Sequence, residues 1–331
     1  MTYSLIKPLL FAVDPELAHD VSLEMLQQFH RLLPQRRIQQ PTRVMGLDFP
    51  NPVGLAAGLD KNADYVDGLA RLGFGFIEVG SVTPRPQPGN PQPRVFRLVR
   101  QQSLINRMGF NNKGVDYLVE RVRDKPRDFV LGINIGKNRD TPLDDALSDY
   151  CLGLEKVYPY ADYVAINISS PNTPGLRELQ NETALDNLLA AIGEQRRRLE
   201  DRHQLRRPLA LKLSPDLDQR AVPAVAEIMR RHAVDGLIAT NTTLDREPVS
   251  GHRLAAEAGG LSGAALRERS REVLSAFSRE LSGEIPIISV GGIDSVDEAR
   301  LRFELGASLI QLYTGLIYRG PGLVNRIVGS L

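Results

Sequence analysis

The chain places a short run of amides and hydroxyls where a buried strand is expected to end. Residues 163–166 read Tyr-Val-Ala-Ile, a β-branched run, and residues 167–172 read Asn-Ile-Ser-Ser-Pro-Asn. Side chains at the carboxyl ends of parallel strands carry the chemistry of α/β enzymes. We therefore expect Asn167, Ser170 and Asn172 to lie in an active site.

Two lysines stand at the ends of other expected strands. Lys61 follows the segment 53–57, and Lys212 lies near the end of the segment 208–213. Lysine is disfavoured where the interior of a protein begins, so both side chains are expected to face a charged ligand.

Glycines follow the last two expected strands. Residues 288–293 read Ile-Ser-Val-Gly-Gly-Ile, and residues 313–315 read Tyr-Thr-Gly. In barrels, the loops after strands seven and eight bind phosphate through backbone N–H groups. This pattern indicates a phosphorylated ligand without saying which one. A further glycine cluster at 259–263 is a weak motif by itself and is compatible with a flexible loop.

Amides make up most of the remaining candidates. They are Asn106, Asn134, Asn167, Asn172 and Asn241. Asparagine both donates and accepts hydrogen bonds, which suits a flat heterocycle. None of the five histidines follows an expected strand and no two have metal-ligand spacing, so neither a histidine base nor a metal site is expected. Phosphate, amides and no histidine base together suggest an FMN barrel that handles a small planar substrate.

A Schiff-base aldolase remains an alternative at this point. Lys212 would lie on a central strand near a phosphate site, and a desolvated lysine can attack a carbonyl. Borohydride trapping of a substrate on Lys212 would support the aldolase, whereas a tightly bound flavin would exclude it.

Eight short β-rich segments alternate with helical patterns from residue 52 onward. The expected strands are 53–57, 75–80, 129–135, 162–168, 208–213, 236–241, 285–290 and 308–313. Helices are expected at 62–72, 183–204, 217–232, 265–281 and 295–305, with N-caps at Asp216 and Ser295 and C-terminal glycines at Gly73 and Gly306. In a chain of 331 residues this alternation favours an α/β fold, a closed (β/α)8 TIM barrel, over an open sheet.

Three segments fall outside the repeat. Residues 84–93 are rich in proline and glycine and residues 94–106 alternate like a β-hairpin, which predicts an insertion at the rim of the barrel. Residues 169–182 form a long loop, a candidate lid. Residues 1–40 form an N-terminal two-helix extension, and residues 41–331 form the barrel.

The N-terminal extension is amphipathic. Asp14-Pro15 is a typical helix start, and an apolar stripe follows it at Val21, Met25, Phe29 and Leu33. The two helices could pack onto the barrel or lie in a membrane interface. In the second case four basic residues would lie near lipid headgroups: Lys7, Arg31, Arg36 and Arg37.

Bulk composition excludes several functional classes. With 41 basic and 40 acidic residues the net charge is +1, and no basic run with interleaved aromatics predicts nucleic-acid binding. The single cysteine, Cys151, excludes a disulfide framework and a thiolate metal cluster, and suits a reducing compartment. No stretch approaches the ~20 apolar residues of a membrane span.

Nine motifs in order along nearly the whole chain resemble dihydroorotate dehydrogenase. They are Ala56-Ala-Gly-Leu-Asp-Lys-Asn62, Gly80-Ser-Val-Thr-Pro84, Asn106-Arg-Met-Gly-Phe-Asn111, Asn167-Ile-Ser-Ser-Pro-Asn172, Lys212-Leu-Ser214, Thr240-Asn-Thr-Thr243, Gly259-Gly-Leu-Ser-Gly263, Val290-Gly-Gly-Ile293 and Tyr313-Thr-Gly315. The chain is similar to class 2, the membrane-associated, quinone-reducing form, because serine occupies position 170, where soluble class 1 enzymes have cysteine, and because class 1 lacks the helical extension.

Two rivals to this interpretation remain. Class 1 chemistry would use fumarate or NAD as oxidant, and a comparison of oxidants separates it from class 2. The second rival is a catalytically silent barrel that serves as a membrane scaffold. The polar residues at nearly every strand end argue against this rival.

The resemblance implies a reaction and a site. Ser170 would remove a proton from C5 of dihydroorotate while a hydride passes from C6 to N5 of FMN, giving orotate for pyrimidine (UMP) biosynthesis. The matching orotate positions are Lys61, Asn106, Arg107, Met108, Gly109, Phe110, Asn167, Asn172, Asn241 and Thr242. The matching FMN positions are Ala57, Gly58, Leu59, Asp60, Lys61, Ser81, Asn134, Asn167, Lys212, Thr240, Gly263, Gly292, Tyr313 and Thr314. Lys212 is expected beside the N1/O2 edge of the flavin, and Gly292 and Thr314 at its phosphate.

The resemblance also gives the N-terminal helices a function. They would form the mouth of a tunnel for ubiquinone or menaquinone, with His19 and Arg97 lining it. We then expect a peripheral protein on the cytoplasmic face of the inner membrane, a monomer with one FMN per chain and no metal ion.

Overall fold

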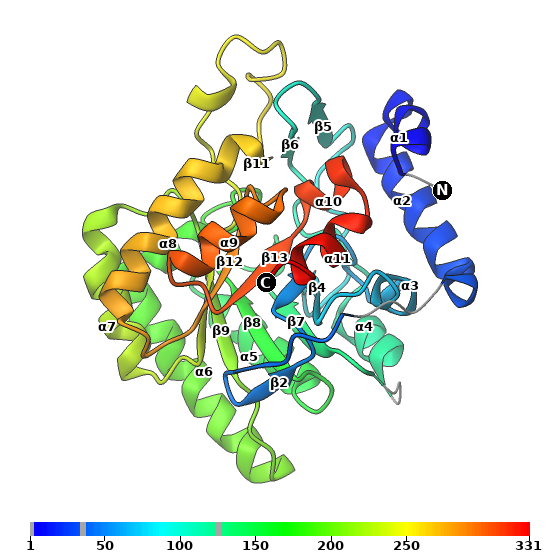
Figure 1. The fold of residues 1–331 in the computed structure, drawn as a ribbon. Helices are drawn as coiled ribbons and strands as arrows, with labels where there is room; N and C mark the ends of the chain where they lie inside the picture. The colour runs from blue at the N-terminus through cyan, green and yellow to red at the C-terminus, as the bar shows by residue number, and fades with distance from the viewer. Residues whose placement is uncertain (1–2, 34–37, 124–126) are drawn as a thin grey trace.

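Eight parallel strands close into a barrel, as the alternation in the sequence predicted (Figure 1). The structure, a computed structural model, describes residues 3–33, 38–123 and 127–331. The barrel strands are β3 (Val53–Leu55), β4 (Phe76–Val82), β7 (Val130–Ile135), β8 (Tyr163–Asn167), β9 (Leu209–Leu213), β10 (Gly236–Ala239), β12 (Ile287–Val290) and β13 (Leu309–Leu312). Each coincides with one of the eight expected segments.

Helices cover the outside of the barrel (Figure 1). They are α3 (Val66–Ala70), α4 (Val115–Val122), α5 (Ala146–Val157), α6 (Glu182–His203), α7 (Val222–Arg231), α8 (Arg267–Leu281), α9 (Val296–Glu304), α10 (Thr314–Arg319) and α11 (Gly322–Val328). Short 3-10 turns are η1 (His30–Leu32), η2 (Leu176–Gln180), η3 (Gln219–Ala221), η4 (Glu247–Val249) and η5 (Ala264–Leu266).

Of the two expected N-caps, one is confirmed and one is wrong. Ser295 accepts a hydrogen bond from the Glu298 amide at 3.1 Å and caps α9. Asp216 caps no helix, because its carboxylate accepts from Arg177 at 2.7 Å and from the Leu244 amide at 2.8 Å. These rim contacts hold Asp216 outside α7, which begins only after η3.

A small antiparallel pair closes the amino-terminal end of the barrel. Strands β1 (Thr42–Val44) and β2 (Leu47–Phe49) pair with each other, and Phe49 is buried against Phe76 with ring centroids 5.3 Å apart. The barrel interior at this end is therefore packed core.

The insertion at the rim is a hairpin that gains a third strand. Strands β5 (Val95–Leu98) and β6 (Ser103–Asn106) form the expected hairpin, and β11 (Gly260–Gly263) pairs with β6. The glycine cluster at 259–263 is therefore a strand and not a flexible loop. A Cβ atom on Gly260 would lie 1.8 Å from Thr242 Oγ1, so glycine lets this strand approach the site closely.

The N-terminal extension forms two helices, α1 (Tyr3–Ala12) and α2 (Pro15–Gln28), beside the barrel (Figure 1). Asp14 caps α2 as expected, by accepting from the Glu16 and Leu17 amides. Tyr3 donates to the Ile317 carbonyl and Gln27 accepts from the Gly68 amide at 2.8 Å, so both helices attach to the barrel. The N-terminal segment also exposes apolar side chains, including Leu5, Leu9, Leu17, Met25, Phe29 and Leu32. Arg36 and Arg37, expected near headgroups, lie outside the described residues.

Candidate active site at the carboxyl rim of the barrel

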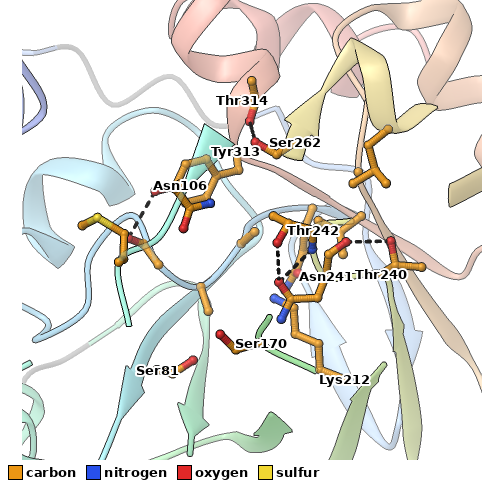
Figure 2. A pocket seen from close by; sticks show the side chains of 18 of the residues that line it. Ser81, Asn106, Ser170, Lys212, Thr240, Asn241, Thr242, Ser262, Tyr313 and Thr314 are labelled. Carbon is orange, nitrogen blue, oxygen red and sulfur yellow. Dashed lines mark hydrogen bonds between the residues drawn. The ribbon is translucent and has the colours of Figure 1, made fainter. Parts of the chain in front are cut away.

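A pocket at the carboxyl ends of the strands brings most of the predicted site residues together (Figure 2). The predicted residues that line it are Ala57, Gly58, Lys61, Ser81, Asn106, Met108, Gly109, Phe110, Asn167, Ser170, Asn172, Lys212, Thr240, Asn241, Thr242, Gly263, Gly292, Tyr313 and Thr314. The prediction missed Ser262, Leu266 and Gln311, which also line it. Gln311 carries a signal that sequence reasoning could have used, since a glutamine inside a barrel strand is unusual.

Four predicted residues do not line this pocket. The Arg107 guanidinium turns outward, donating to Glu257 at 2.7 Å and to the Pro93 carbonyl at 2.8 Å. The Asp60 carboxylate accepts from the amides of residues 64 and 65 and shapes the turn that carries Lys61. Leu59 faces a second cavity, and Asn134 lies beneath the pocket.

Ser170 is buried at the rim with its hydroxyl directed into the pocket (Figure 2). Its Oγ accepts a hydrogen bond from the backbone N–H of Asn172 at 3.3 Å. Within the described part of the chain, the Ser170 hydroxyl donates to no protein acceptor. This oxygen is therefore oriented by the backbone, while its own hydrogen is available to a ligand or solvent.

The surrounding amides hold one another in place. Asn172 Nδ2 donates to Asn106 Oδ1 at 3.2 Å, and Asn241 Nδ2 donates to Ser169 Oγ at 3.0 Å. Because these bonds use only part of each amide's capacity, donors and acceptors remain for the edges of a planar heterocycle.

A chain of buried hydrogen bonds runs from this rim down into the barrel. Asn167 Nδ2 donates to Ser81 Oγ at 2.9 Å, the Ser81 hydroxyl donates to Asn134 Oδ1, and Asn134 Nδ2 donates to Glu78 Oε1 at 2.8 Å. Sequence reasoning missed Glu78, although a glutamate in the middle of a buried strand is a signal that it could have used.

Both predicted lysines reach the pocket. Lys212 Nζ lies 3.9 Å from Glu78 Oε1; burial lowers the pKa of Lys212, and Glu78 partly offsets that effect. Lys61 Nζ donates to the Gly58 carbonyl at 2.8 Å. Burial lowers the pKa of Lys61 to about 8, and the Glu16 carboxylate opposes the shift. Lys61 therefore titrates close to physiological pH.

Backbone and hydroxyl groups converge at the other end of the pocket. Ser262 Oγ and Thr314 Oγ1 lie 2.9 Å apart (Figure 2). Gly263, Gly291 and Gly292 line the same pocket with bare backbone. Gly292 has φ +75°, and a Cβ atom there would lie 2.6 Å from Arg267 Cα, so only glycine fits. The glycine turn is fixed from behind by the fully buried Arg302, which donates to the Gly291 carbonyl at 2.7 Å. This end suits a phosphate group.

A second, apolar cavity of about 470 Å³ separates the N-terminal helices from the barrel. Side chains of both helices line it, among them Ile6, Leu10, Phe11, Leu23, Met25 and Phe29. The polar residues predicted for it, His19 and Arg97, are both present. Burial and nearby Lys61 lower the pKa of His19 to about 3, so its ring is neutral at physiological pH. Arg97 donates to the Val13 carbonyl at 2.7 Å and stacks over the Phe11 ring.

The two cavities share one wall. Residues that line both are Lys61, Asn106, Met108, Ser262 and Tyr313. A ligand held against this wall in the polar pocket would therefore lie next to the apolar cavity. Among the described helices, none combines the length and hydropathy that crossing a membrane requires. In the same described ranges, no group of histidine, cysteine or acidic side chains is arranged to hold a metal ion.

Comparison with known proteins identifies the family. Residues 40–331 match the family model described as dihydroorotate dehydrogenase. The chain is 54% identical over 334 residues to a protein of Nitrosomonas eutropha named dihydroorotate dehydrogenase (quinone), covering 100% of this chain and 98% of the relative. A protein of Aromatoleum aromaticum with the same name is 54% identical, over 99% of this chain and 94% of the relative. The solved ligand-free DHODH of Eimeria tenella superposes with a TM-score of 0.89 at 39% identity, over 96% and 94% of the two chains. The chain belongs to the dihydroorotate dehydrogenase family.

Proposed function

We propose that the protein oxidises dihydroorotate to orotate with FMN as its cofactor and passes the electrons to a membrane quinone. The observation that carries the proposal is the wall shared by the polar pocket and the apolar cavity. A redox cofactor against that wall can exchange electrons with a polar substrate on one side and an apolar acceptor on the other. The names of the relatives agree with this assignment.

The residues of the polar pocket fit FMN. Gln311 donates to Glu78 at 2.7 Å, while its buried Oε1 atom has no hydrogen-bond partner among the described residues. The Lys212 ammonium likewise makes no hydrogen bond to the described residues, its ion pair with Glu78 being 3.9 Å long. These groups suit the polar edge of an isoalloxazine ring, and the backbone at Gly263 and Gly292 with the Thr314 hydroxyl suits the phosphate. When bound, FMN supplies a two-electron acceptor that the quinone re-oxidises.

The chain's own groups would bind the substrate and take up its proton. Ser170 is the proposed base for the proton on C5 of dihydroorotate. A serine hydroxyl is a weak base and needs strong stabilisation of the charge that develops on the substrate. Lys61, as an ammonium, and the amides of Asn106, Asn172 and Asn241 line the same pocket and would provide it.

The apolar cavity is the proposed quinone site, and His19 and Arg97 are the residues proposed to lie beside a quinone carbonyl. His19 is neutral, so it adds no charge to the cavity. The exposed apolar side chains of α1 and α2, followed by the exposed Arg31, support peripheral attachment to the cytoplasmic face of the inner membrane. Lys7, also expected near headgroups, instead donates to the Tyr318 carbonyl at 3.0 Å and so faces the barrel. Residues 1–40 would thus act as the quinone-binding extension of a monomeric barrel at 41–331.

An anaerobic absorbance spectrum tests the proposal. The purified protein should show oxidised flavin that bleaches when dihydroorotate is added and returns when a quinone is added. Flavin that does not bleach would contradict dihydroorotate as substrate. A colourless protein that cannot be reconstituted with FMN would overturn the proposal and return attention to a Schiff base on Lys212. Fumarate or NAD restoring the colour faster than quinone would favour class 1 chemistry.

A further inference from the structure

Glu78 is a fully buried carboxylate in the middle of β4, directed into the barrel below the pocket. Its Oε2 atom accepts from the Tyr163 hydroxyl at 2.8 Å and from Gln311 Nε2 at 2.7 Å. Its Oε1 atom accepts from Asn134 Nδ2 at 2.8 Å. Three strands other than β4 therefore contribute hydrogen-bond donors to the Glu78 carboxylate, and these donors fix the positions of both carboxylate oxygens.

The one cation that faces this carboxylate, within the described residues, is Lys212 of β9. The two groups form an ion pair at 3.9 Å, with side chains 7% and 0% exposed. The other polar groups that surround Glu78 are uncharged: Asn134 and Gln311 are amides, and burial followed by the nearby Glu78 charge raises the pKa of Tyr163 far above its usual range. Breaking a buried pair by removing one partner leaves an uncompensated charge at high cost.

We propose that Glu78 is a positioning residue for the redox reaction, which holds Lys212 as an ammonium in the polar pocket before the cofactor is reduced. Because the pair of Glu78 and Lys212 has no net charge, it places no uncompensated positive charge next to the oxidised cofactor. When the cofactor gains negative charge on reduction, the cation that would stabilise it is already in place and no additional proton has to reach Lys212 Nζ. The inference rests on the proposed function in assuming that the cofactor is FMN.

Removal of the carboxylate should change the proton balance of reduction. Burial lowers the pKa of Lys212 and Glu78 opposes this, so a neutral residue at position 78 lowers that pKa further and shifts Lys212 toward the amine in the oxidised protein. Two-electron reduction of the cofactor to its anionic form takes up one proton when Lys212 is already an ammonium. It takes up two when Lys212 starts as an amine, because the new negative charge draws the second proton onto Nζ.

The test is a potentiometric titration of the FMN-loaded holoenzyme between pH 7 and 9, in which the pH dependence of the midpoint potential counts protons per two electrons. We expect one proton for the wild-type protein and two for Glu78→Gln over part of this range. Tyr163→Phe is the matched control: it removes one hydrogen bond from Glu78 and keeps its charge, so its count should stay at one. A count of one in Glu78→Gln would overturn the inference.

Two further outcomes are separable from that one. A wild-type protein that binds no flavin would overturn the proposed function, whereas flavin that stays bound with an unchanged proton count overturns only the role of Glu78. Should Glu78→Gln fail to fold, Glu78→Gln/Lys212→Met removes both charges and should restore folded protein. Failure of the double variant as well would show that Glu78 does not act by pairing with Lys212.

Discussion

Glu16 of α2 and Arg94, which precedes β5, form a buried ion pair that joins the N-terminal helices to the barrel rim. Arg94 Nη2 lies 2.6 Å from Glu16 Oε1, and the two side chains are 10% and 12% exposed. The other end of the guanidinium donates to the Pro88 and Asn90 carbonyls, and Asn90 in turn donates to the Arg107 carbonyl. One contact thus links a wall of the apolar cavity to the loop beside the substrate pocket.

Glu16→Gln should destabilise the attachment of these helices. Breaking a buried pair from one side costs about 3–5 kcal/mol, because Arg94 keeps an unpaired charge. Burial raises the pKa of Glu16, but hydrogen bonds from Arg94 outweigh it and the net shift is downward. The pair's contribution is therefore present above the usual carboxyl pKa and is lost as the pH falls through the lowered value. Urea unfolding at pH 7 and at pH 4 should show a smaller difference between variant and wild type at pH 4.

The exposed pair of Glu194 and Arg198 provides the control for that measurement. Its side chains are 57% and 68% exposed, so Glu194→Gln should change the free energy of unfolding by no more than about 1 kcal/mol. Equal effects of the two glutamate variants would show that the Glu16–Arg94 contact adds nothing beyond a surface charge.

Ser170→Ala should slow reduction of the bound flavin by dihydroorotate while the flavin stays bound. General base catalysis contributes about 10²–10⁴-fold, and the loss should appear in the anaerobic stopped-flow rate of bleaching. Ser169→Ala is the matched neighbour: its hydroxyl donates to Asn167 Oδ1 and accepts from Asn241, so its removal loosens the amides without removing the proposed base. Ser169→Ala as slow as Ser170→Ala, or an unchanged rate in Ser170→Ala, would remove Ser170 from the role of base.

The barrel and the rim residues were predictable because both follow from local patterns. Each strand is a short, largely apolar run, and parallel strands must deliver their carboxyl ends to one rim, so Asn167, Lys212 and Gly292 meet although they are far apart in the sequence. The prediction needed only the order of the strands along the chain.

The failures involve side chains whose partners lie on distant segments. The sequence predicts Asp216 as a helix cap, but in the structure its carboxylate accepts hydrogen bonds from Arg177 and from the Leu244 amide. Arg107 lies within a site motif, yet its guanidinium points out of the pocket because it donates a hydrogen bond to Glu257, 150 residues later in the chain. In the sequence Glu78 is a charged residue within a strand and has no evident partner. The structure supplies that partner, because Lys212 of another strand forms an ion pair with it. Such pairings depend on strand register and on loop paths that no local pattern specifies.

Lys61 should make substrate binding sensitive to pH. With a pKa lowered to about 8 by burial, its ammonium is present below that pH and is lost as the pH rises through it. The dissociation constant of orotate, an anion, should therefore be constant up to about pH 7.5 and rise roughly tenfold by pH 9. Titration of orotate against the flavin spectrum at several pH values checks this.

Lys61→Arg is the control for the titration with orotate. Guanidinium stays protonated over the whole range, so the variant's affinity should not change between pH 7 and 9, whatever its absolute value. A wild-type dissociation constant that is equally flat would contradict Lys61 as the cation that binds the anion.

Deletion of residues 1–35 should separate the two half-reactions. The deletion removes one wall of the apolar cavity and both predicted helices, but leaves Ser170, Lys212 and the glycine turn at Gly292 untouched. Reduction of the flavin by dihydroorotate should therefore keep most of its rate, while reduction of a long-chain quinone and binding to lipid vesicles should be lost. A water-soluble dye is the control acceptor, because it needs no apolar cavity and should still be reduced.

Some destabilisation is expected in that truncated protein, because the cavity wall formed by Leu59, Leu69 and Leu316 becomes exposed to water. Flavin content and the unfolding midpoint therefore have to be measured alongside the rates. If both half-reactions fall equally in a protein that keeps its flavin, the helices only support the barrel. If dye reduction persists and quinone reduction does not, the extension is the part of the chain through which an apolar acceptor reaches the shared wall.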